Sequence, residues 1–156
     1  MSIATFGAGC FWGVELTFSK LPGVTATRVG YMGGNTDQPD YRAVCNGDTY
    51  HAEVVEVTFD PARIDYETLL STFFKCHDPT QLNRQGPDIG TQYRSAVFVH
   101  DDTQAALARA AIDELNRHQS GANPVVTSIE PATTFWQAED YHQNYLEKRG
   151  VNSCGI

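Results

Sequence analysis

The sequence predicts one domain over residues 1–156 of the α+β class. We expect a two-layer α/β sandwich with a ferredoxin-like βαββαβ core, one extra helix and strand, and a coil tail at the C-terminus. Three observations support this prediction. The 156 residues, 41% of them hydrophobic, suffice for one buried core. Short apolar runs alternate with helical periodicity in the order of that core. The sequence also lacks internal repeats, low-complexity tracts and linkers.

The first expected elements are a strand, a helix and a second strand. The apolar run Ile3–Phe6 reads as a strand, and Trp12–Leu21 reads as a helix that the breaker pair Pro22-Gly23 ends. Val24–Tyr31 is the next strand and runs into a glycine-rich turn. The polar and aromatic residues from that turn to His51 are expected to form a loop.

A strand and a capped helix follow. Glu53–Phe59 shows the alternation of a strand with two different faces. Asp65 is a typical N-cap residue, and the helix after it places five apolar side chains on one face. These side chains are Tyr66, Leu69, Leu70, Phe73 and Phe74.

The rest of the chain completes the core and adds the extra helix and strand. In chain order the expected elements are a loop (His77–Gln92), a strand (Tyr93–Val99), a helix (Asp102–Gln119), a strand (Val125–Ile129) and a helix (Ala138–Lys148). The inward residues of the first of these helices are Ala105, Ala108, Ile112 and Leu115. The tail over residues 150–156 is expected to be mobile.

Composition narrows the class of partner and the compartment. A formal net charge of -8 argues against nucleic acid or an anionic membrane surface as a partner. No apolar stretch approaches the roughly 20 residues of a membrane span, and we expect no signal peptide before Cys10. Four cysteines without an export signal favour thiols kept reduced in the cytoplasm. Their positions, Cys10, Cys45, Cys76 and Cys154, exclude a paired zinc-binding motif.

The segment Gly9-Cys10-Phe11-Trp12-Gly13 is the strongest candidate for a reactive site. Cys10 falls between a strand and a helix, at or just before the helix start. The positive end of the helix dipole and the free amides there stabilise a thiolate, so we expect a lowered pKa and a nucleophilic sulfur. Phe11 and Trp12 beside it suit a pocket for a small nonpolar group.

Glu53 is the second candidate. Strand alternation places it on the apolar face with Val55, Val57 and Phe59. Burial there raises the pKa of a carboxyl, which can then be protonated near neutral pH and act as an acid. The alternatives are a strand-end glutamate that only leans toward the core, or one half of a buried ion pair.

Further polar residues are candidates whose ordinary interpretation is structural. Tyr41 and Tyr93 are possible hydroxyl donors, although Tyr93 is expected on the inward face of its strand as a core residue. Asp88 lies in a loop where aspartates commonly make turn hydrogen bonds. His51 and His77 are candidate general bases or ligands, or else structural hydrogen-bonding groups.

The other three cysteines differ in context. Cys154 lies among small residues in the tail, where it could swing to meet another sulfur, or could be an incidental exposed thiol. Cys45 is expected in a loop and Cys76 at a helix end near the core. We interpret both as spectators.

The Gly9–Gly13 motif is the first of a series. Further motifs, in order, are Val29–Gly34, Tyr41–Gly47, His51–Val55, His77–Gln81, Arg84–Ser95, Ala138–Gln143 and the terminal cysteine. Together they resemble the A-type peptide methionine sulfoxide reductases over nearly the whole chain. One departure is Tyr50, where that family commonly has glycine.

The resemblance implies thiol-dependent reduction of methionine S-sulfoxide, free or in proteins, as repair of oxidative damage. It implies that Cys10 is the nucleophile and becomes a sulfenic acid, that Cys154 resolves it as a Cys10–Cys154 disulfide, and that thioredoxin recycles the enzyme. No metal or organic cofactor is needed, and we expect a monomer. The other implied roles are methyl binding by Phe11 and Trp12, proton donation by Glu53, oxygen binding by Tyr41 and Tyr93, and polar support by Asp88.

Two other functions stay open from the residues alone. A cysteine hydrolase would pair Cys10 with one histidine and with Asp78 or Asp88, and it needs that histidine within hydrogen-bond reach of the thiol. A non-enzymatic redox sensor would use Cys10 and Cys154 but leaves Glu53 without a role. Within the reductase hypothesis, Cys45 or Cys76 is an alternative resolving cysteine.

Overall fold

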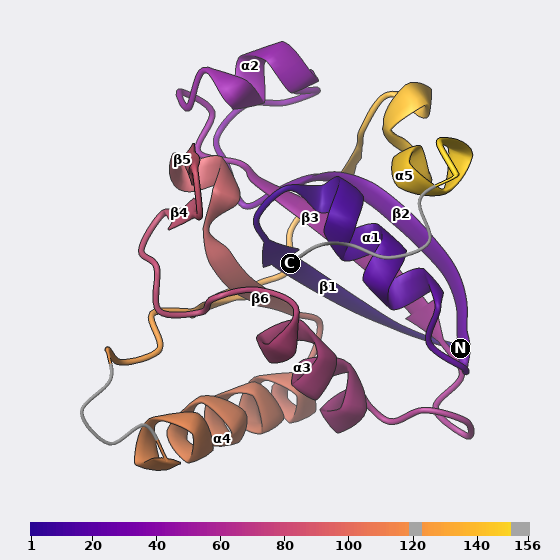
Figure 1. Cartoon of the computed structure of the whole chain (residues 1–156), viewed down its shortest axis with the longest axis vertical. Coiled ribbons are helices and arrows are strands. Elements are labelled where there is room, and N and C mark those ends of the chain that lie inside the picture. The colour runs from indigo at the N-terminus through magenta and orange to yellow at the C-terminus, as the bar shows by residue number, and fades with distance from the viewer. Residues whose placement is uncertain (119–122, 151–156) are drawn as a thin grey trace.

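A mixed sheet forms the framework of the computed structural model, which describes residues 1–118 and 123–150 (Figure 1). Within those residues the sheet has six strands in the order β7-β6-β1-β3-β2-β8, and a separate hairpin pairs β4 with β5. The strands of the sheet are β1 (Ser2–Ala8), β2 (Val24–Met32), β3 (Ala52–Phe59), β6 (Ser95–Val99), β7 (Ser128–Pro131) and β8 (Trp136–Gln137). The hairpin strands are β4 (Arg84–Gln85) and β5 (Asp88–Ile89).

Helices connect and cover the strands. They are α1 (Phe11–Ser19), α2 (Tyr41–Cys45), α3 (Tyr66–Lys75), α4 (Asp102–His118) and α5 (Tyr145–Lys148). Two 3-10 turns, Thr91–Tyr93 and Asp140–His142, lie at the ends of longer loops. No helix in the described part of the chain has both the length and the apolar character to cross a membrane.

The four central strands have the order β6-β1-β3-β2, and each neighbouring pair is antiparallel. Helix α1 follows β1 and helix α3 follows β3, an arrangement compatible with the predicted ferredoxin-like core. At the edges, β7 is parallel to β6, and β8 is antiparallel to β2. The predicted α+β fold with a helical layer on a sheet is therefore confirmed.

The main core lies between the sheet and α1, α3 and α4. Phe6 of β1 is at its centre, with ring centroids 5.1 Å from both Phe18 of α1 and Phe73 of α3. Figure 1 shows α1 lying across the front of the sheet. The opposite face of the sheet packs against Ala132 and Phe135 from the chain between β7 and β8. Alternate residues of β3 serve these two faces, as the sequence pattern predicted.

Several predicted elements are confirmed with small changes at their ends. The expected strands Ile3–Phe6, Val24–Tyr31 and Glu53–Phe59 lie within β1, β2 and β3. The helix predicted from Trp12 begins one residue earlier and ends at Ser19. Asp65 caps α3 as predicted, because its side chain accepts a hydrogen bond from the Thr68 amide at 2.8 Å.

The prediction of an uninterrupted loop before His51 was wrong, because α2 lies within it. Asp40 begins this helix by accepting a hydrogen bond from the Ala43 amide at 2.7 Å. The expected loop His77–Gln92 also contains the β4–β5 hairpin. Both elements are shorter than the periodic patterns that sequence analysis can detect.

The last two predicted elements also needed correction. Strand β7 begins at Ser128 rather than Val125, because the Val125 and Val126 amides are held outside the sheet by Asn116 and Pro79. The helix predicted over Ala138–Lys148 is divided into a 3-10 turn and α5. Asn144 divides it, since its φ of 54° is left-handed.

Candidate active site

Cys10 lies at the turn between β1 and α1. It is the N-cap residue of α1, as the sequence predicted, and follows Gly9, whose φ is +93°. A Cβ on Gly9 would approach the Gln85 side chain to 2.9 Å, so this turn needs glycine for both its conformation and its space. The turn fixes the Cys10 sulfur at the end of the helix and beside the β4–β5 hairpin.

The electrostatic surroundings of Cys10 correct one prediction. Burial, together with the negative charges of Glu53 and Asp88, raises the pKa of the Cys10 thiol to about 12. The amides of Trp12 and Gly13 hydrogen-bond to the sulfur and act in the opposite direction, but they are outweighed. The expectation of a lowered pKa was therefore wrong for this state of the protein, because burial and two carboxylates exceed the helix-end effect.

Glu53 is 1% exposed and lies at the start of β3 on the face that packs against α1. The Phe11 amide donates a hydrogen bond to its Oε1 at 3.3 Å, while Oε2 has no hydrogen-bond partner among the described residues. Burial raises the pKa of this carboxyl to about 8, against the Phe11 hydrogen bond, which lowers it. The predicted burial of Glu53 is confirmed, and its pKa is raised in the direction expected from that burial.

Tyr41 and Tyr93 lie on the same side as Glu53. Tyr41 is the first residue of α2, and Tyr93 ends a 3-10 turn rather than lying in the strand where it was predicted. The pKa of each phenol is raised, chiefly by burial and then, for Tyr93, by the nearby charges of Glu53, Cys45 and Asp88. Both hydroxyls therefore remain protonated and can donate hydrogen bonds.

Aromatic rings enclose the other side of the site. The Phe11 ring is buried, with centroids 5.8 Å from Tyr31 and 6.3 Å from Tyr41. Trp12 is partly exposed and stacks on Tyr145 with a centroid distance of 3.9 Å. Trp12 lines the cavity at Cys10 described below, whereas Phe11 is packed in the core and does not line that cavity.

Sequence reasoning missed several residues around these rings. The Trp12 indole donates a hydrogen bond to Nδ1 of His142 at 2.9 Å. Glu139 accepts hydrogen bonds from the Tyr31 hydroxyl at 3.1 Å and from the Tyr41 amide at 3.2 Å. The motif Ala138–Gln143 marked this segment as part of the site. Because the segment was predicted as part of a continuous helix, the sequence did not indicate which residues its side chains contact.

A cavity of about 390 Å³ opens onto Cys10. Its largely apolar walls include Trp12, Pro87 and Leu146, and Asp88 of β5 contributes a carboxylate beside the sulfur. Such a space suits a small, mostly apolar ligand with one polar group.

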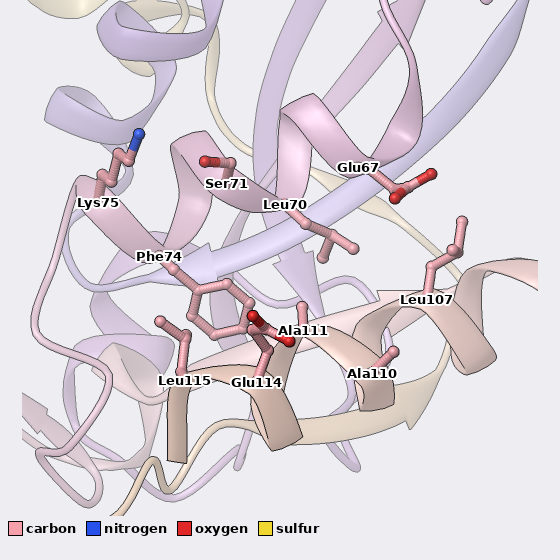
Figure 2. Close-up of a pocket in the computed structure, with 10 residues that line it drawn as sticks. All are labelled: Glu67, Leu70, Ser71, Phe74, Lys75, Leu107, Ala110, Ala111, Glu114 and Leu115. Carbon is pink, nitrogen blue, oxygen red and sulfur yellow. The ribbon is translucent and has the colours of Figure 1, made fainter. Parts of the chain in front are cut away.

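Figure 2 shows a different cavity of about 440 Å³ between α3 and α4. Its side chains, among them Leu70, Phe74 and Leu115, are mostly apolar, and no cysteine lines it. The thiol chemistry is therefore associated with the cavity at Cys10.

The histidines that the sequence raised as bases have structural partners. His51 accepts a hydrogen bond from the Gly34 amide at 2.9 Å and contacts the Thr36 carbonyl at 2.6 Å. His77 contacts the Phe73 carbonyl and the Ser95 hydroxyl, and burial lowers its pKa to about 4. Among the described residues, no histidine is hydrogen-bonded to Cys10, so the geometry does not favour a cysteine hydrolase.

The remaining cysteines are placed differently. Cys45 ends α2, and its thiol interacts with the Tyr41 and Tyr93 hydroxyls, so it lies at the site rather than away from it. Cys76 is buried as predicted, and its thiol donates to the Phe73 carbonyl at 3.2 Å. Cys154 and the rest of the expected tail beyond residue 150 lie outside the described residues.

Tyr50, the departure from the family pattern, has a φ of 57° and is 56% exposed. This left-handed conformation explains why glycine suits the position. A non-glycine residue there costs on the order of 1 kcal/mol.

Comparisons with known proteins show the family and the fold of the chain. Residues 2–156 match the family model for peptide methionine sulfoxide reductase. Over 151 residues the chain is 60% identical to peptide methionine sulfoxide reductase MsrA of Geobacter sulfurreducens, covering 97% of this chain and 93% of that protein. Methionine sulfoxide reductase A of Corynebacterium diphtheriae has a similar fold, with a TM-score of 0.90, 39% identity, and coverage of 98% of this chain and 77% of that chain. Mxr1 of Saccharomyces cerevisiae in complex with Trx2 matches with a TM-score of 0.63 and 27% identity, over 92% of this chain and 84% of that chain.

Proposed function

The chain belongs to the peptide methionine sulfoxide reductase family, and on that premise we propose that it reduces methionine S-sulfoxide, free or in proteins, with Cys10 as nucleophile. The observation that supports this most strongly is the buried Glu53 carboxyl near Cys10. Its pKa of about 8 and its unpartnered Oε2, among the described residues, suit a proton donor for a sulfoxide oxygen.

In the first step the Cys10 sulfur attacks the sulfoxide sulfur. Glu53 protonates the sulfoxide oxygen, which makes it a better leaving group. In the resulting intermediate the Cys10 sulfur is bonded to the substrate sulfur, which carries the protonated oxygen as a hydroxyl. The hydroxyl then passes to the Cys10 sulfur as the sulfur–oxygen and sulfur–sulfur bonds of the intermediate both break. Methionine leaves reduced by two electrons, and Cys10, oxidised by two electrons, is left as a sulfenic acid. The Trp12 and Gly13 amides favour the thiolate that attacks, and a neutral Glu53 no longer opposes it.

Five other side chains orient the substrate. The Tyr41 and Tyr93 hydroxyls donate hydrogen bonds to the sulfoxide oxygen and stabilise the charge that develops there. Phe11 and Trp12 hold the methyl group against their rings, and Asp88 supports the polar side of the cavity through water. Support for these assignments comes from the position of each side chain around Cys10 and Glu53.

The second step restores the enzyme. The Cys154 thiol condenses with the Cys10 sulfenic acid, releasing water and forming a Cys10–Cys154 disulfide. Thioredoxin then reduces this disulfide, for which the complex of Mxr1 with Trx2 is the supporting precedent. We further propose that residues 1–156 are one domain, that residues 150–156 carry the resolving cysteine, and that the protein works in the cytoplasm, where thiols stay reduced.

Replacing Cys154 by serine is expected to leave one turnover per enzyme and to block cycling with thioredoxin. Without the second sulfur the Cys10 sulfenic acid lacks its proposed resolving partner. Methionine released per enzyme, measured with and without thioredoxin, checks this expectation, and Cys76→Ser is the matched control. Normal cycling in Cys154→Ser would instead assign resolution to Cys45 or Cys76.

The proposed function as a whole is tested by thioredoxin-coupled oxidation of NADPH, with each epimer of a blocked methionine sulfoxide supplied separately. Turnover with the S epimer and none with the R epimer is expected. If neither epimer reacts, a single-turnover assay with dithiothreitol separates a failure of recycling from a failure of the reductase chemistry. If no methionine forms in either assay, the proposal is overturned and the redox-sensor hypothesis is favoured.

A further inference from the structure

His142 makes a contact that fixes its protonation state. The Trp12 indole nitrogen lies 2.9 Å from Nδ1 of His142. An indole N–H can only donate a hydrogen bond, so Nδ1 must carry a lone pair. The imidazole is therefore neutral, with its hydrogen on Nε2.

The other ring nitrogen of His142 lowers the stability of the fold. His142 is 1% exposed, and its Nε2 is buried without a hydrogen-bond partner in the part of the chain that the structure describes. A buried N–H without a partner destabilises a fold. The stability of the protein therefore does not explain why this position holds a histidine.

Ring packing does not explain it either. The imidazole centroid lies 5.3 Å from Phe11, 4.4 Å from Tyr41 and 4.1 Å from Tyr141. A phenylalanine could fill the same space among these rings and would bury no polar atom. What histidine adds to the cluster is the acceptor at Nδ1, and Trp12 uses it.

The ring contacts of Trp12 are stacked ones, with Tyr145 at 3.9 Å and Tyr41 at 6.4 Å between centroids, and they do not supply a hydrogen-bond acceptor for its indole nitrogen. Its ring stacks on Tyr145 with an interplanar angle of 14°. Stacking sets the plane of the indole but restrains rotation within that plane only weakly. A hydrogen bond at the indole nitrogen fixes this rotation, and with it the ring edge that lines the cavity at Cys10.

We infer that His142 is a positioning residue that holds the Trp12 indole in the orientation that receives the substrate methyl group. The inference rests on the proposed function, which gives Trp12 its role in binding. His142 acts through Trp12 and takes no part in the transfer of oxygen or protons. Its loss therefore weakens substrate binding more than it slows the chemical step.

The test compares His142→Phe with His142→Asn. Phenylalanine keeps the ring but removes the acceptor, whereas the asparagine Oδ1 can take the place of Nδ1. For His142→Phe we expect KM for methionine sulfoxide to rise roughly 5- to 10-fold with kcat within about 2-fold, because one neutral hydrogen bond is lost. We expect His142→Asn to recover most of that rise in KM, and the Tm of His142→Phe to equal or exceed that of the parent.

Fluorescence gives a readout that needs no activity. The chain has two tryptophans, so Trp136→Phe leaves Trp12 as the only tryptophan, and its emission can be excited selectively over that of the tyrosines. In that background His142→Phe should shift the Trp12 emission, and His142→Asn should shift it less. An unchanged KM and emission in His142→Phe would overturn the inference, as would an equal rise in KM in both variants. Failure of the proposed function would look different, since the parent protein itself would not reduce the sulfoxide.

Discussion

Replacing Cys10 by serine is expected to lower the rate of methionine sulfoxide reduction by a factor on the order of 10⁶, which abolishes the activity in practice. The sulfur of Cys10 receives the oxygen of the substrate, and a serine hydroxyl cannot be oxidised in this way. Release of methionine in a single turnover with dithiothreitol measures the loss directly, because that assay needs neither thioredoxin nor Cys154.

Cys45→Ser is the matched control for this experiment. Cys45 interacts with the Tyr41 and Tyr93 hydroxyls, so it is a second thiol at the same site. We expect Cys45→Ser to release methionine at nearly the parental rate in the single turnover. Methionine release by Cys10→Ser, or its absence in Cys45→Ser alone, would move the nucleophile to Cys45.

The local signals in the sequence were sufficient for much of the site. Gly9 before Cys10 indicated the turn that ends β1, and the alternation of β3 placed Glu53 on the helix-covered face. Asp65 marked the start of α3. Each of these inferences depends on residues within a few positions of one another, where backbone geometry alone decides the outcome.

Features set by distant residues could not be predicted in this way. The pKa of Cys10 depends on Glu53 and Asp88, which only the fold brings to it, and the prediction from the helix end alone had the wrong direction. Asn144 interrupts the last predicted helix while its amide donates to Glu15 of α1 at 2.7 Å, a contact across most of the chain. His142 and Tyr145 contact Trp12 from that interrupted segment. Because the segment was predicted as one continuous helix, the sequence did not reveal these contacts.

Replacing Glu53 by glutamine is expected to slow formation of methionine roughly 10²–10⁴-fold, the usual cost of losing a general acid. Glutamine can still accept the Phe11 hydrogen bond but cannot supply a proton to the sulfoxide oxygen. Glu56→Gln is the control, because Glu56 lies on the same strand with its side chain on the opposite face, paired with Arg28. Its reductase rate should stay close to that of the parent.

Glu53→Gln slows formation of methionine but is expected to increase the reactivity of the Cys10 thiol. The two effects therefore separate the charge of Glu53 from its role as a proton donor. Below a pH of about 8 Glu53 is largely protonated, so the parent and Glu53→Gln present the same neutral group to Cys10. Above that pH the carboxylate forms and raises the pKa of Cys10 in the parent alone. Cys10 alkylation by iodoacetamide measures this difference. The ratio of the rate in Glu53→Gln to the rate in the parent should be near one at low pH and should increase as the pH rises through about 8.

The two readouts together decide what Glu53 does. Faster alkylation of the variant thiol above a pH of about 8 is expected together with slower formation of methionine below it. The variant lacks the carboxylate charge in the first range and the acid in the second. A flat alkylation ratio would contradict the electrostatic coupling between Glu53 and Cys10. A rising ratio with an unchanged reductase rate would make Glu53 a neighbour that only tunes the thiol, and the proton for the sulfoxide oxygen would then have to come from Tyr41 or Tyr93.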